Sequence, residues 1–543
     1  MSSVDCVNTI LIGLPDRWPI PIPVSLVLST LLAAVINFWV SFDMILDTFV
    51  NAELLSVDSS CQTTTFDYII VGAGGAGMVV ATRIANASSF ASILLLEAGG
   101  EPSVLNDIPA FDAYLENQPA NTWLYNSTEQ TNACQNCDGK KVLTTRGKML
   151  GGSTSTNFMM YVRGNKEDYN RWSTEDLGGD PQWNYENLLP YFKKSEDYNG
   201  AWASPKPRMP RPIMCFPRLM SQLKTLARAH TALFKDTGKP SNLCIKKYAL
   251  VFKINFETVS EKPKAFSVTY QRQGLTQTVT ATKEIILSAG TFGSAKLLML
   301  SGVGPAHHLS SLDIPIVKDL PVGSQLQDHV TTIVGPFLKS QGVNPNRDLT
   351  VQAATEFLKS GTGLLAAPGT LTGQGFIKSP VAQPDYADIQ MVHASASLYP
   401  KLPKDLNKMF GPRVDILESW FDPYHKQNVD ARFGLLILGR PKSVGKLRLA
   451  NRNPDDNPIM DLQYLRHPDD VEALLFGFKK FVDLYENTAA LNTTLFPKPV
   501  PGCESFAFKS DDYYRCVIRS FSFSIYHHVG SCALGKVVDN QLK

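Results

Sequence analysis

The residues best suited to chemistry begin with a glycine-rich turn at 72–77. Its glycines stand at Gly72, Gly74 and Gly77. In this spacing the first permits a tight turn, the second lets the backbone approach a pyrophosphate, and the third lets a helix pack closely on a strand. Glu97 follows about 20 residues later, where a carboxylate can accept hydrogen bonds from ribose hydroxyls. The pattern predicts a dinucleotide site; the alternative is a glycine-rich turn without a ligand.

The elements around this turn favour the dinucleotide site. Residues 66–71 form a continuous apolar and β-branched run, typical of a parallel strand buried on both faces. A helix is predicted over 78–85, and residues 92–97 predict a second buried strand that ends in the acid. This βαβ unit places the start of the helix against the phosphates. It does not choose between NAD and FAD, because both contain an ADP half.

A second group of small residues lies at 146–164. Paired glycines and hydroxyl side chains let the backbone lie against a flat, extended cofactor, although a mobile polar loop would explain the composition equally well. The segment resembles the first signature of the glucose–methanol–choline (GMC) family of flavin oxidoreductases, which implies that the cofactor is FAD. The candidate cofactor-binding residues in this segment are Arg146, Gly151, Gly152, Ser153, Asn157 and Met160.

Further segments match this family in its own order. Residues 284–305 resemble the second family signature, a buried strand followed by a glycine turn and a helix. Residues 320–329 resemble a segment on the cofactor side, and residues 441–449 look like a strand of the substrate domain. The resemblance implies an α/β fold in which a Rossmann-like FAD-binding domain is interleaved with an α+β substrate domain built on an antiparallel sheet.

Two adjacent histidines near the C-terminus are the candidates for proton transfer. They lie in the sequence Tyr-His-His-Val-Gly-Ser-Cys at 526–532. Imidazole has a pKa suited to taking a proton from a hydroxyl group near neutral pH. By resemblance, His527 occupies the family's catalytic-base position, and His528 stands where relatives usually have proline. His329 adjoins a cofactor-side motif, and we expect its role to be structural. No metal site is expected.

The resemblance implies oxidation of an alcohol by hydride transfer to FAD, with oxygen or a quinone as electron acceptor. Residues 195–197 and 467–472 look most like the insect branch, which makes glucose or an aryl alcohol such as salicyl alcohol the candidate substrates. Relatives carry a longer segment where this chain has residues 200–228, and a second catalytic His or Asn beyond the position of Lys543. We therefore expect weak or no turnover from the chain as written. The alternative function is a truncated or inactive secreted paralogue.

Composition narrows the class of protein. The chain has 543 residues, of which 44% are hydrophobic and 19% charged, as in a globular protein with a large core. Lys and Arg total 52 and Asp and Glu total 50, which leaves a net charge of +2. There is no long run of one sign, so the sequence lacks the basic stripe of a nucleic-acid binder.

The N-terminal residues predict export. Residues 18–42 are uncharged and largely apolar, and residues 50–52 are an acceptable cleavage site, so a cleaved signal peptide is favoured over a membrane anchor. The chain is then secreted, without stable membrane association. Sequons at Asn86, Asn126 and Asn492 agree with a glycosylating compartment. Cys134 and Cys137 have the spacing of half a zinc site, but a loop disulfide or two ordinary thiols is the better interpretation.

The predicted division of the chain has six parts. They are a signal peptide or anchor (1–52), the first part of the FAD-binding domain (61–200), a shortened connecting and substrate-side region (201–282), the second part of the FAD-binding domain (283–335), the substrate domain (336–515) and the start of a C-terminal catalytic and FAD-binding segment (516–543).

Overall fold

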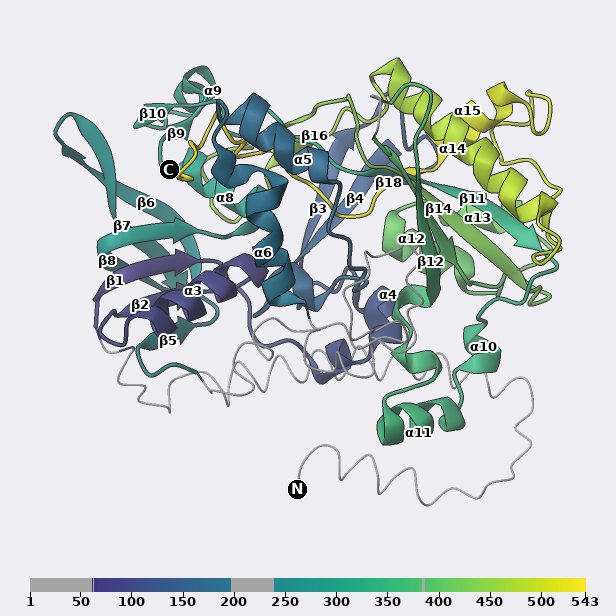
Figure 1. Cartoon of the computed structure of the whole chain (residues 1–543), viewed down its shortest axis with the longest axis horizontal. Coiled ribbons are helices and arrows are strands. Elements are labelled where there is room, and N and C mark those ends of the chain that lie inside the picture. The colour runs from purple at the N-terminus through teal and green to yellow at the C-terminus, as the bar shows by residue number, and fades with distance from the viewer. Residues whose placement is uncertain (1–60, 62, 197–238, 383–385) are drawn as a thin grey trace.

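A computed structural model describes residues 61, 63–196, 239–382 and 386–543. The first of its two large sheets has six strands and holds the predicted dinucleotide turn (Figure 1). Its first four strands run parallel, and the last two continue as an antiparallel meander. In spatial order the strands are β5 (Leu243–Lys246), β2 (Ile93–Leu96), β1 (Thr65–Val71), β8 (Leu275–Leu287), β7 (Lys262–Arg272) and β6 (Leu250–Val259).

Both faces of this sheet are buried, which explains the apolar runs of β1 and β2. Helix α3 (Gly75–Ala87) packs on one face through Met78 and Ala81. The opposite face is covered by helix α8 (Gly290–Leu300) and by the curled meander. The predicted βαβ unit is therefore confirmed, with strand and helix bounds within a few residues of those expected.

The described part of the predicted connecting region differs from expectation. Residues 243–282 supply β5, β6, β7 and part of β8 to the sheet that contains β1, so they belong with the dinucleotide-binding part and not with the substrate side. The pairing of β8 explains why these strands belong to one sheet. β8 pairs with β1 through residues 280–287 and with β7 through residues 275–280, so one long strand joins the parallel and antiparallel halves.

The second large sheet is antiparallel throughout. Its order is β12 (Leu371–Ile377), β13 (Ile389–Ala394), β14 (Ala431–Leu438), β11 (Val330–Leu338) and β17 (Thr494–Leu495), and β18 (Ser522–Ser524) also pairs with β11. Helices α14 (Pro468–Asn487) and α15 (Asp511–Ser520) lie on its outer side (Figure 1). The expected fold class, a dinucleotide-binding part interleaved with an antiparallel α+β part, is confirmed.

Local sequence explains where α14 begins. The ring of His467 accepts a hydrogen bond from the Asp469 backbone N–H, and Pro468 occupies the first turn. The predicted strand within 441–449 is also present, as β15 (Lys446–Arg448). It pairs with β16 (Ile459–Asp461) in a separate two-stranded sheet and not with the large one.

The remaining elements connect these two parts. The C-terminal segment leaves β18 and returns to the first part of the molecule near α9 (Figure 1).

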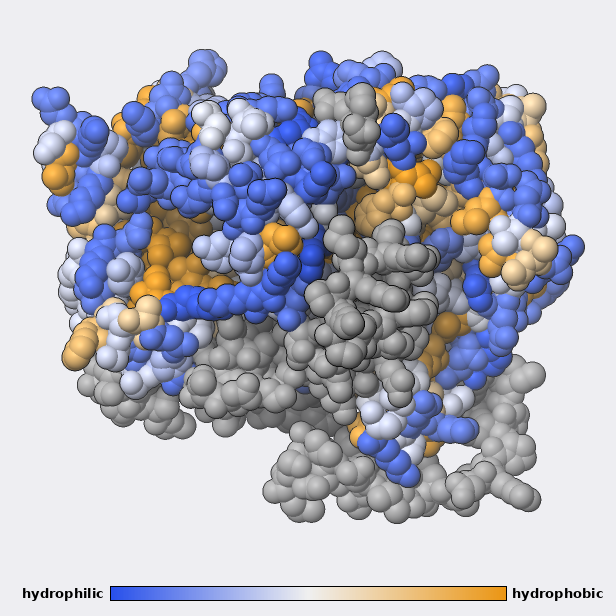
Figure 2. All heavy atoms as spheres, viewed as in Figure 1, coloured by the Kyte–Doolittle hydropathy of each residue, from blue (hydrophilic) through white to orange (hydrophobic). Residues whose placement is uncertain are grey.

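Hydrophilic residues cover most of the visible face, and hydrophobic residues group in a recess between the first sheet and α6 (Figure 2). The other helices and strands are α4 (Asp112–Leu115), α5 (Lys166–Arg171), α6 (Tyr185–Ser195), α9 (Ala306–Ser311), α10 (Pro345–Asp348), α11 (Val351–Ser360), α12 (Leu402–Phe410), α13 (Val414–Phe421), β3 (Thr122–Glu129), β4 (Lys141–Gly147), β9 (Val303–Gly304) and β10 (Lys318–Asp319).

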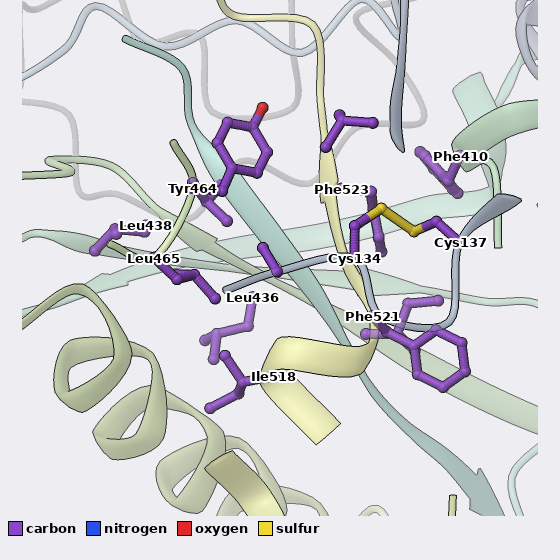
Figure 3. Packing of buried hydrophobic residues seen from close by; sticks show 14 of the residues in the cluster. Cys134, Cys137, Phe410, Leu436, Leu438, Tyr464, Leu465, Ile518, Phe521 and Phe523 are labelled. Atoms are coloured by element: carbon purple, nitrogen blue, oxygen red, sulfur yellow. A yellow bond between two sulfur atoms is a disulfide. The ribbon is translucent and has the colours of Figure 1, made fainter. Parts of the chain in front are cut away.

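The loop between β3 and β4 is closed by a buried disulfide, Cys134–Cys137. It packs beside Phe521 and Phe523 at the base of the C-terminal segment (Figure 3). The disulfide interpretation of this pair is therefore confirmed. Two further disulfides join Cys61 to Cys244 and Cys503 to Cys516, and Cys532 is the free cysteine of the described residues.

Removing the 134–137 disulfide with Cys134→Ala/Cys137→Ala should lower the free energy of unfolding by about 2 kcal/mol, because it closes only a short loop. Cys503 and Cys516 are 13 residues apart in sequence, so their disulfide closes a longer loop. The Cys503→Ala/Cys516→Ala variant should therefore lose about 3 kcal/mol of unfolding free energy. Urea unfolding of both variants and the parent chain measures these differences. A 134/137 variant as stable as its parent would contradict the prediction.

Within the described ranges, no helix combines the length and the apolar character needed to cross a bilayer. The predicted export segment at 18–42 lies outside those ranges.

Candidate active site

In the glycine turn between β1 and α3, backbone atoms leave no room for a side chain at two of the three glycines. Gly72 has φ +98°, and a Cβ there would lie 2.5 Å from the Ser288 carbonyl oxygen. A Cβ on Gly77 would lie 1.9 Å from the carbonyl oxygen of Gly72. Both positions therefore require glycine for the fold itself. At Gly74 the backbone is extended. Gly152 Cα, at 3.9 Å, is the only heavy atom of the described residues within 4 Å of a Cβ there, so this position has room for a side chain.

Glu97 follows β2 and fixes the shape of this turn. Its carboxylate accepts hydrogen bonds from the backbone N–H of Ala73, at 2.8 Å, and of Gly99, at 2.9 Å. Burial raises the pKa of Glu97, and these two backbone donors act against that rise. Each carboxylate oxygen retains a second lone pair. Glu97 thus stands where the sequence placed it, beside the glycine turn.

Glu97→Gln should weaken the turn. An amide has one acceptor oxygen, so its NH2 group would face one of the two backbone donors and leave that donor unsatisfied. Loss of a buried partner of this kind costs about 1–3 kcal/mol. We expect a lower midpoint in urea unfolding and less bound flavin per chain. The same substitution at the exposed Glu284 should leave both values unchanged.

The 146–157 loop lies directly against the glycine turn. The Gly151 N–H donates to the Ala73 carbonyl at 2.8 Å, and a Cβ on Gly152 would lie 2.8 Å from Gly74 Cα. Ser153 and Asn157 are exposed and Met160 is half-buried. The structure therefore brings most of the predicted cofactor residues to the dinucleotide turn.

Arg146 lies at a different place from the other residues of its motif. It extends from β4, donates to the Tyr526 carbonyl and lies over the Phe292 ring, with 5.2 Å from its Cζ to the ring centroid. Burial lowers its pKa, and Asp328 opposes that effect. Arg146 therefore joins the 146–157 loop to the loop that carries the two histidines.

Asp328 holds the histidine loop. This buried residue precedes β11, and its carboxylate accepts the His527 backbone N–H at 3.0 Å and the Ser524 hydroxyl at 2.6 Å. The Tyr464 hydroxyl donates to the same carboxylate. Burial acts to raise the pKa of Asp328, but His528 and these hydroxyl donors hold it below its usual value.

His527 contacts a second histidine, His329, although the sequence predicts only a structural role for it. The Nδ1 atoms of His527 and His329 lie 3.0 Å apart. Burial lowers the pKa of His527 to about 4, and His329 adds to the effect, so the ring is neutral near neutral pH. Burial also lowers the pKa of His329. The only signal for His329 was its place in the Leu-Gln-Asp-His motif beside the predicted cofactor-side segment.

His528 is fully buried and takes a different position. Its Nε2 lies 3.2 Å from the Asp328 carboxylate without hydrogen-bond geometry, and its ring meets Phe292 edge-on. Its carbonyl accepts the Thr291 hydroxyl at 2.7 Å, and the Ser531 hydroxyl donates to the Thr291 carbonyl at 2.6 Å. These bonds fasten the histidine loop to the start of α8.

A cavity of about 360 Å³ opens beside the two facing histidines. Its wall includes His329, His527 and Gly439, and an ion pair of 2.9 Å joins Arg440 to Asp168 at its side. Among the described residues that line it, the two imidazoles are the only aromatic side chains. The cavity is at the small end of the range for ligand sites, and its walls combine charged side chains, such as Asp168 and Arg440, with apolar surface.

The residues near the glycine turn fit a dinucleotide cofactor. Among the buried acceptor atoms without a hydrogen-bond partner in the described part of the chain is Asn106 Oδ1. The Asn106 amide donates to the Ser155 carbonyl, which ties it to the 146–157 loop. Since a flavin dinucleotide carries several hydroxyl and N–H donors, it offers partners for such atoms. Elsewhere in the described ranges, no three His, Cys, Asp or Glu side chains gather to hold a metal ion.

Comparisons with known proteins agree with this arrangement. Two family models described as GMC oxidoreductase match residues 66–331, in two overlapping segments, and 441–543. The chain is 30% identical to ecdysone oxidase of Bombyx mori over 548 residues, covering 90% of this chain and 77% of the relative. It is 28% identical to glucose dehydrogenase [FAD, quinone] of Drosophila melanogaster over 513 residues, covering 87% and 78%.

Solved structures share the fold. A formate oxidase of Aspergillus oryzae aligns with a TM-score of 0.69 at 22% identity, covering 88% of this chain and 91% of that one. A fungal aryl-alcohol oxidase aligns with a TM-score of 0.65 at 19% identity, covering 89% and 93%.

Proposed function

We infer that this chain, which belongs to the GMC oxidoreductase family, binds FAD and uses it to oxidise an alcohol, with His527 as the base. One observation carries the proposal. Four segments that are far apart in sequence meet at one place: the 72–77 turn, the 146–157 loop, the start of α8 and the 526–531 loop. The 72–77 turn and the 146–157 loop suit a dinucleotide, and the 526–531 loop presents the neutral imidazole of His527 to a cavity.

The chain's own residues account for the proton step. His527 takes the hydroxyl proton of the alcohol while hydride leaves the adjacent carbon. The chemistry that FAD would supply, when bound, is that of a hydride acceptor. Asp328 fixes the backbone of His527, and desolvation lowers the pKa of its ring to about 4, so the ring is neutral near neutral pH. The 72–77 turn and the 146–157 loop would hold the cofactor, with Glu97 supporting the turn.

The cavity bears on the substrate. Its described lining residues include an Arg–Asp ion pair and no phenyl or indole ring, which favours a small polyhydroxylated alcohol such as glucose over an aryl alcohol. The electron acceptor is oxygen or a quinone. A relative is named for glucose and quinone, and another for an aryl alcohol.

An alcohol screen tests the function. The purified chain is loaded with FAD under anaerobic conditions and mixed with glucose, with salicyl alcohol and with a simple primary alcohol. Loss of oxidised-flavin absorbance on mixing supports the proposal, and glucose should act fastest. A chain that retains no flavin when loaded would contradict it at the first step.

We further propose that the chain is secreted and glycosylated. Three disulfides in the described residues suit an oxidising compartment, and the asparagines of all three sequons, Asn86, Asn126 and Asn492, are exposed. In a secretory eukaryotic host, the chain should appear in the medium and lose apparent mass on treatment with an N-glycosidase. Retention in the membrane fraction would instead favour residues 18–42 as an anchor.

A further inference from the structure

We propose that Asp168 and Arg440 together recognise two adjacent hydroxyl groups of the alcohol and thereby determine specificity for polyhydroxylated substrates. The inference rests on the proposed function and adds to it the residues that select the substrate. Asp168 belongs to α5, and Arg440 follows β14. The two side chains meet in the wall of the cavity that His527 also lines.

Strand pairing places Arg440 at the same end of the antiparallel sheet as the facing histidines. Val330, the first residue of β11, pairs with Leu438, the last residue of β14. His329 precedes this pair on one strand, and Arg440 follows it on the other. Because His527 and Arg440 line one cavity, an alcohol whose reacting hydroxyl lies at His527 occupies space that Arg440 also borders.

Two contacts fix the guanidinium group of Arg440. Its Cζ lies 4.0 Å from the centroid of the Tyr386 ring, and its Nη2 lies 2.9 Å from Oδ1 of Asp168. Stacking on a ring engages the face of a guanidinium group, whereas its N–H donors lie in its plane. The ion pair joins one terminal nitrogen to one carboxylate oxygen, so the arginine has further donors, and the carboxylate a further oxygen, to offer a ligand.

The other charged side chains of the described lining are engaged differently. Several are held by two or more hydrogen bonds: Arg171 by Glu175, Asp388 by Ser379, Asp470 by Lys442 and Ser443, and Asp328 by Ser524, Tyr464 and His527. Lys442 and Asp469 form an ion pair. A lysine ammonium is a point charge on a flexible stem, however, and lacks the planar donor array of an arginine. The Asp168–Arg440 pair is therefore the charged group of the described lining that is best suited to bind a ligand.

The pair matches the chemistry of neighbouring hydroxyl groups. A hydroxyl group can both donate and accept a hydrogen bond. One of two adjacent hydroxyls can therefore donate to the Asp168 carboxylate while the other accepts from the Arg440 guanidinium, and the charge of each protein group strengthens its bond. A simple alcohol offers only the hydroxyl that reacts at His527. The pair thus adds binding energy for polyhydroxylated alcohols alone.

Selectivity between two alcohols tests the inference in the full, FAD-loaded chain. Anaerobic flavin reduction is measured with glucose and with butan-1-ol in the parent, in Asp168→Asn and in Arg440→Met. Each substitution removes a charged hydrogen-bonding group, so the second-order rate constant for glucose should fall by about 10- to 100-fold. The rate constant for butan-1-ol should stay within about twofold of the parent, because butan-1-ol does not use the pair. Bound FAD should be unchanged.

Deoxyglucoses locate the effect in the hydroxyl groups of the substrate. Each has one hydroxyl of glucose replaced by hydrogen. In the parent, removal of a hydroxyl that the pair binds should lower the rate constant. In the double variant Asp168→Asn/Arg440→Met the same removal should have little further effect, because the protein groups that bound the hydroxyl are gone. The inference is overturned if every deoxyglucose loses the same factor in the parent and in the double variant.

The control variant is Lys479→Met, which removes an ion pair between α14 and α15. It should leave both rate constants unchanged. Equal losses for glucose and butan-1-ol in Asp168→Asn and Arg440→Met would show that the pair only joins α5 to the end of β14, and would overturn the inference. A loss of glucose selectivity in Lys442→Met together with none in Arg440→Met would also overturn it.

A binding measurement separates this inference from the proposed function. Glucose affinity is measured by calorimetry in FAD-loaded His527→Asn, with and without Asp168→Asn. If no alcohol reduces the flavin of the parent, the proposed function fails, whereas weaker glucose binding with Asp168→Asn still supports the pair, and equal binding or none overturns it. If butan-1-ol reduces the flavin but neither variant changes the preference for glucose, only the role of the pair fails. If Arg440→Met does not fold, the isosteric Asp168→Asn decides the question.

Discussion

His527→Asn is expected to slow reduction of bound FAD by an alcohol by about 10²- to 10⁴-fold, the usual contribution of a positioned base. The asparagine amide can retain a contact with His329 but has no nitrogen able to take a proton. The backbone bond from residue 527 to Asp328 is unaffected by the substitution. Flavin content should therefore match the parent, and stopped-flow absorbance under anaerobic conditions should show only the slower rate.

Two other histidines serve as comparisons. His307 is exposed on α9, so His307→Asn should leave the rate unchanged. His528 is buried behind Asp328, so His528→Asn should act through loop stability more than through the proton step. A strong loss of rate in His528→Asn together with none in His527→Asn would show that the base has been assigned to the wrong histidine.

Gly74→Val should abolish FAD retention while leaving the protein folded. Of the residues that the structure describes, a Cβ at this position meets Gly152 Cα alone, at 3.9 Å, and the backbone at φ −70°, ψ −176° suits any residue. The valine side chain would instead stand where the backbone is expected to meet the pyrophosphate. We expect a far-ultraviolet circular dichroism spectrum like that of the parent and no flavin absorbance after gel filtration.

The matched control is Gly375→Val in β12, where no atom of the described chain lies within 4 Å of an added Cβ. This variant should keep its flavin. Gly77→Val is a useful contrast, because its Cβ would lie 1.9 Å from the Gly72 carbonyl oxygen and should impair folding itself. Normal flavin content in Gly74→Val would remove the 72–77 turn from the cofactor site.

The sequence predicted those features that are encoded locally. Strand β1, the glycine turn and α3 follow one another without interruption, so an apolar run and a glycine spacing were sufficient to identify them. Glu97 was found for the same reason, since it ends the next strand. The antiparallel sheet of the second part was expected only from family resemblance, because its strands pair across long sequence separations.

The rest of the site depends on the pairing of strands that are far apart in sequence, so it could not be predicted from local patterns. The contact of His329 with His527 depends on β11 lying between β14 and β18, and no local pattern reveals that order. The hydrogen bonds from Ser524 and Tyr464 to Asp328 have the same origin. Likewise, the meander β6–β8 joined the first sheet because β8 is long enough to pair with strands on both sides.

The contact with His329 also changes what we expect of turnover. Weak activity was expected because the resemblance placed the partner of the catalytic base beyond Lys543. In the structure Nδ1 of His527 lies 3.0 Å from Nδ1 of His329, and the backbone N–H of His527 donates to Asp328. We therefore expect the chain as it stands to reduce its flavin with an alcohol.

Anaerobic mixing of the FAD-loaded chain with excess alcohol tests the central claim most directly. The proposed function predicts that the oxidised-flavin absorbance disappears and that one carbonyl product forms per flavin, at a rate that falls sharply in His527→Asn. A flavin that stays oxidised with every alcohol tested, while a chemical reductant bleaches it readily, would contradict the claim.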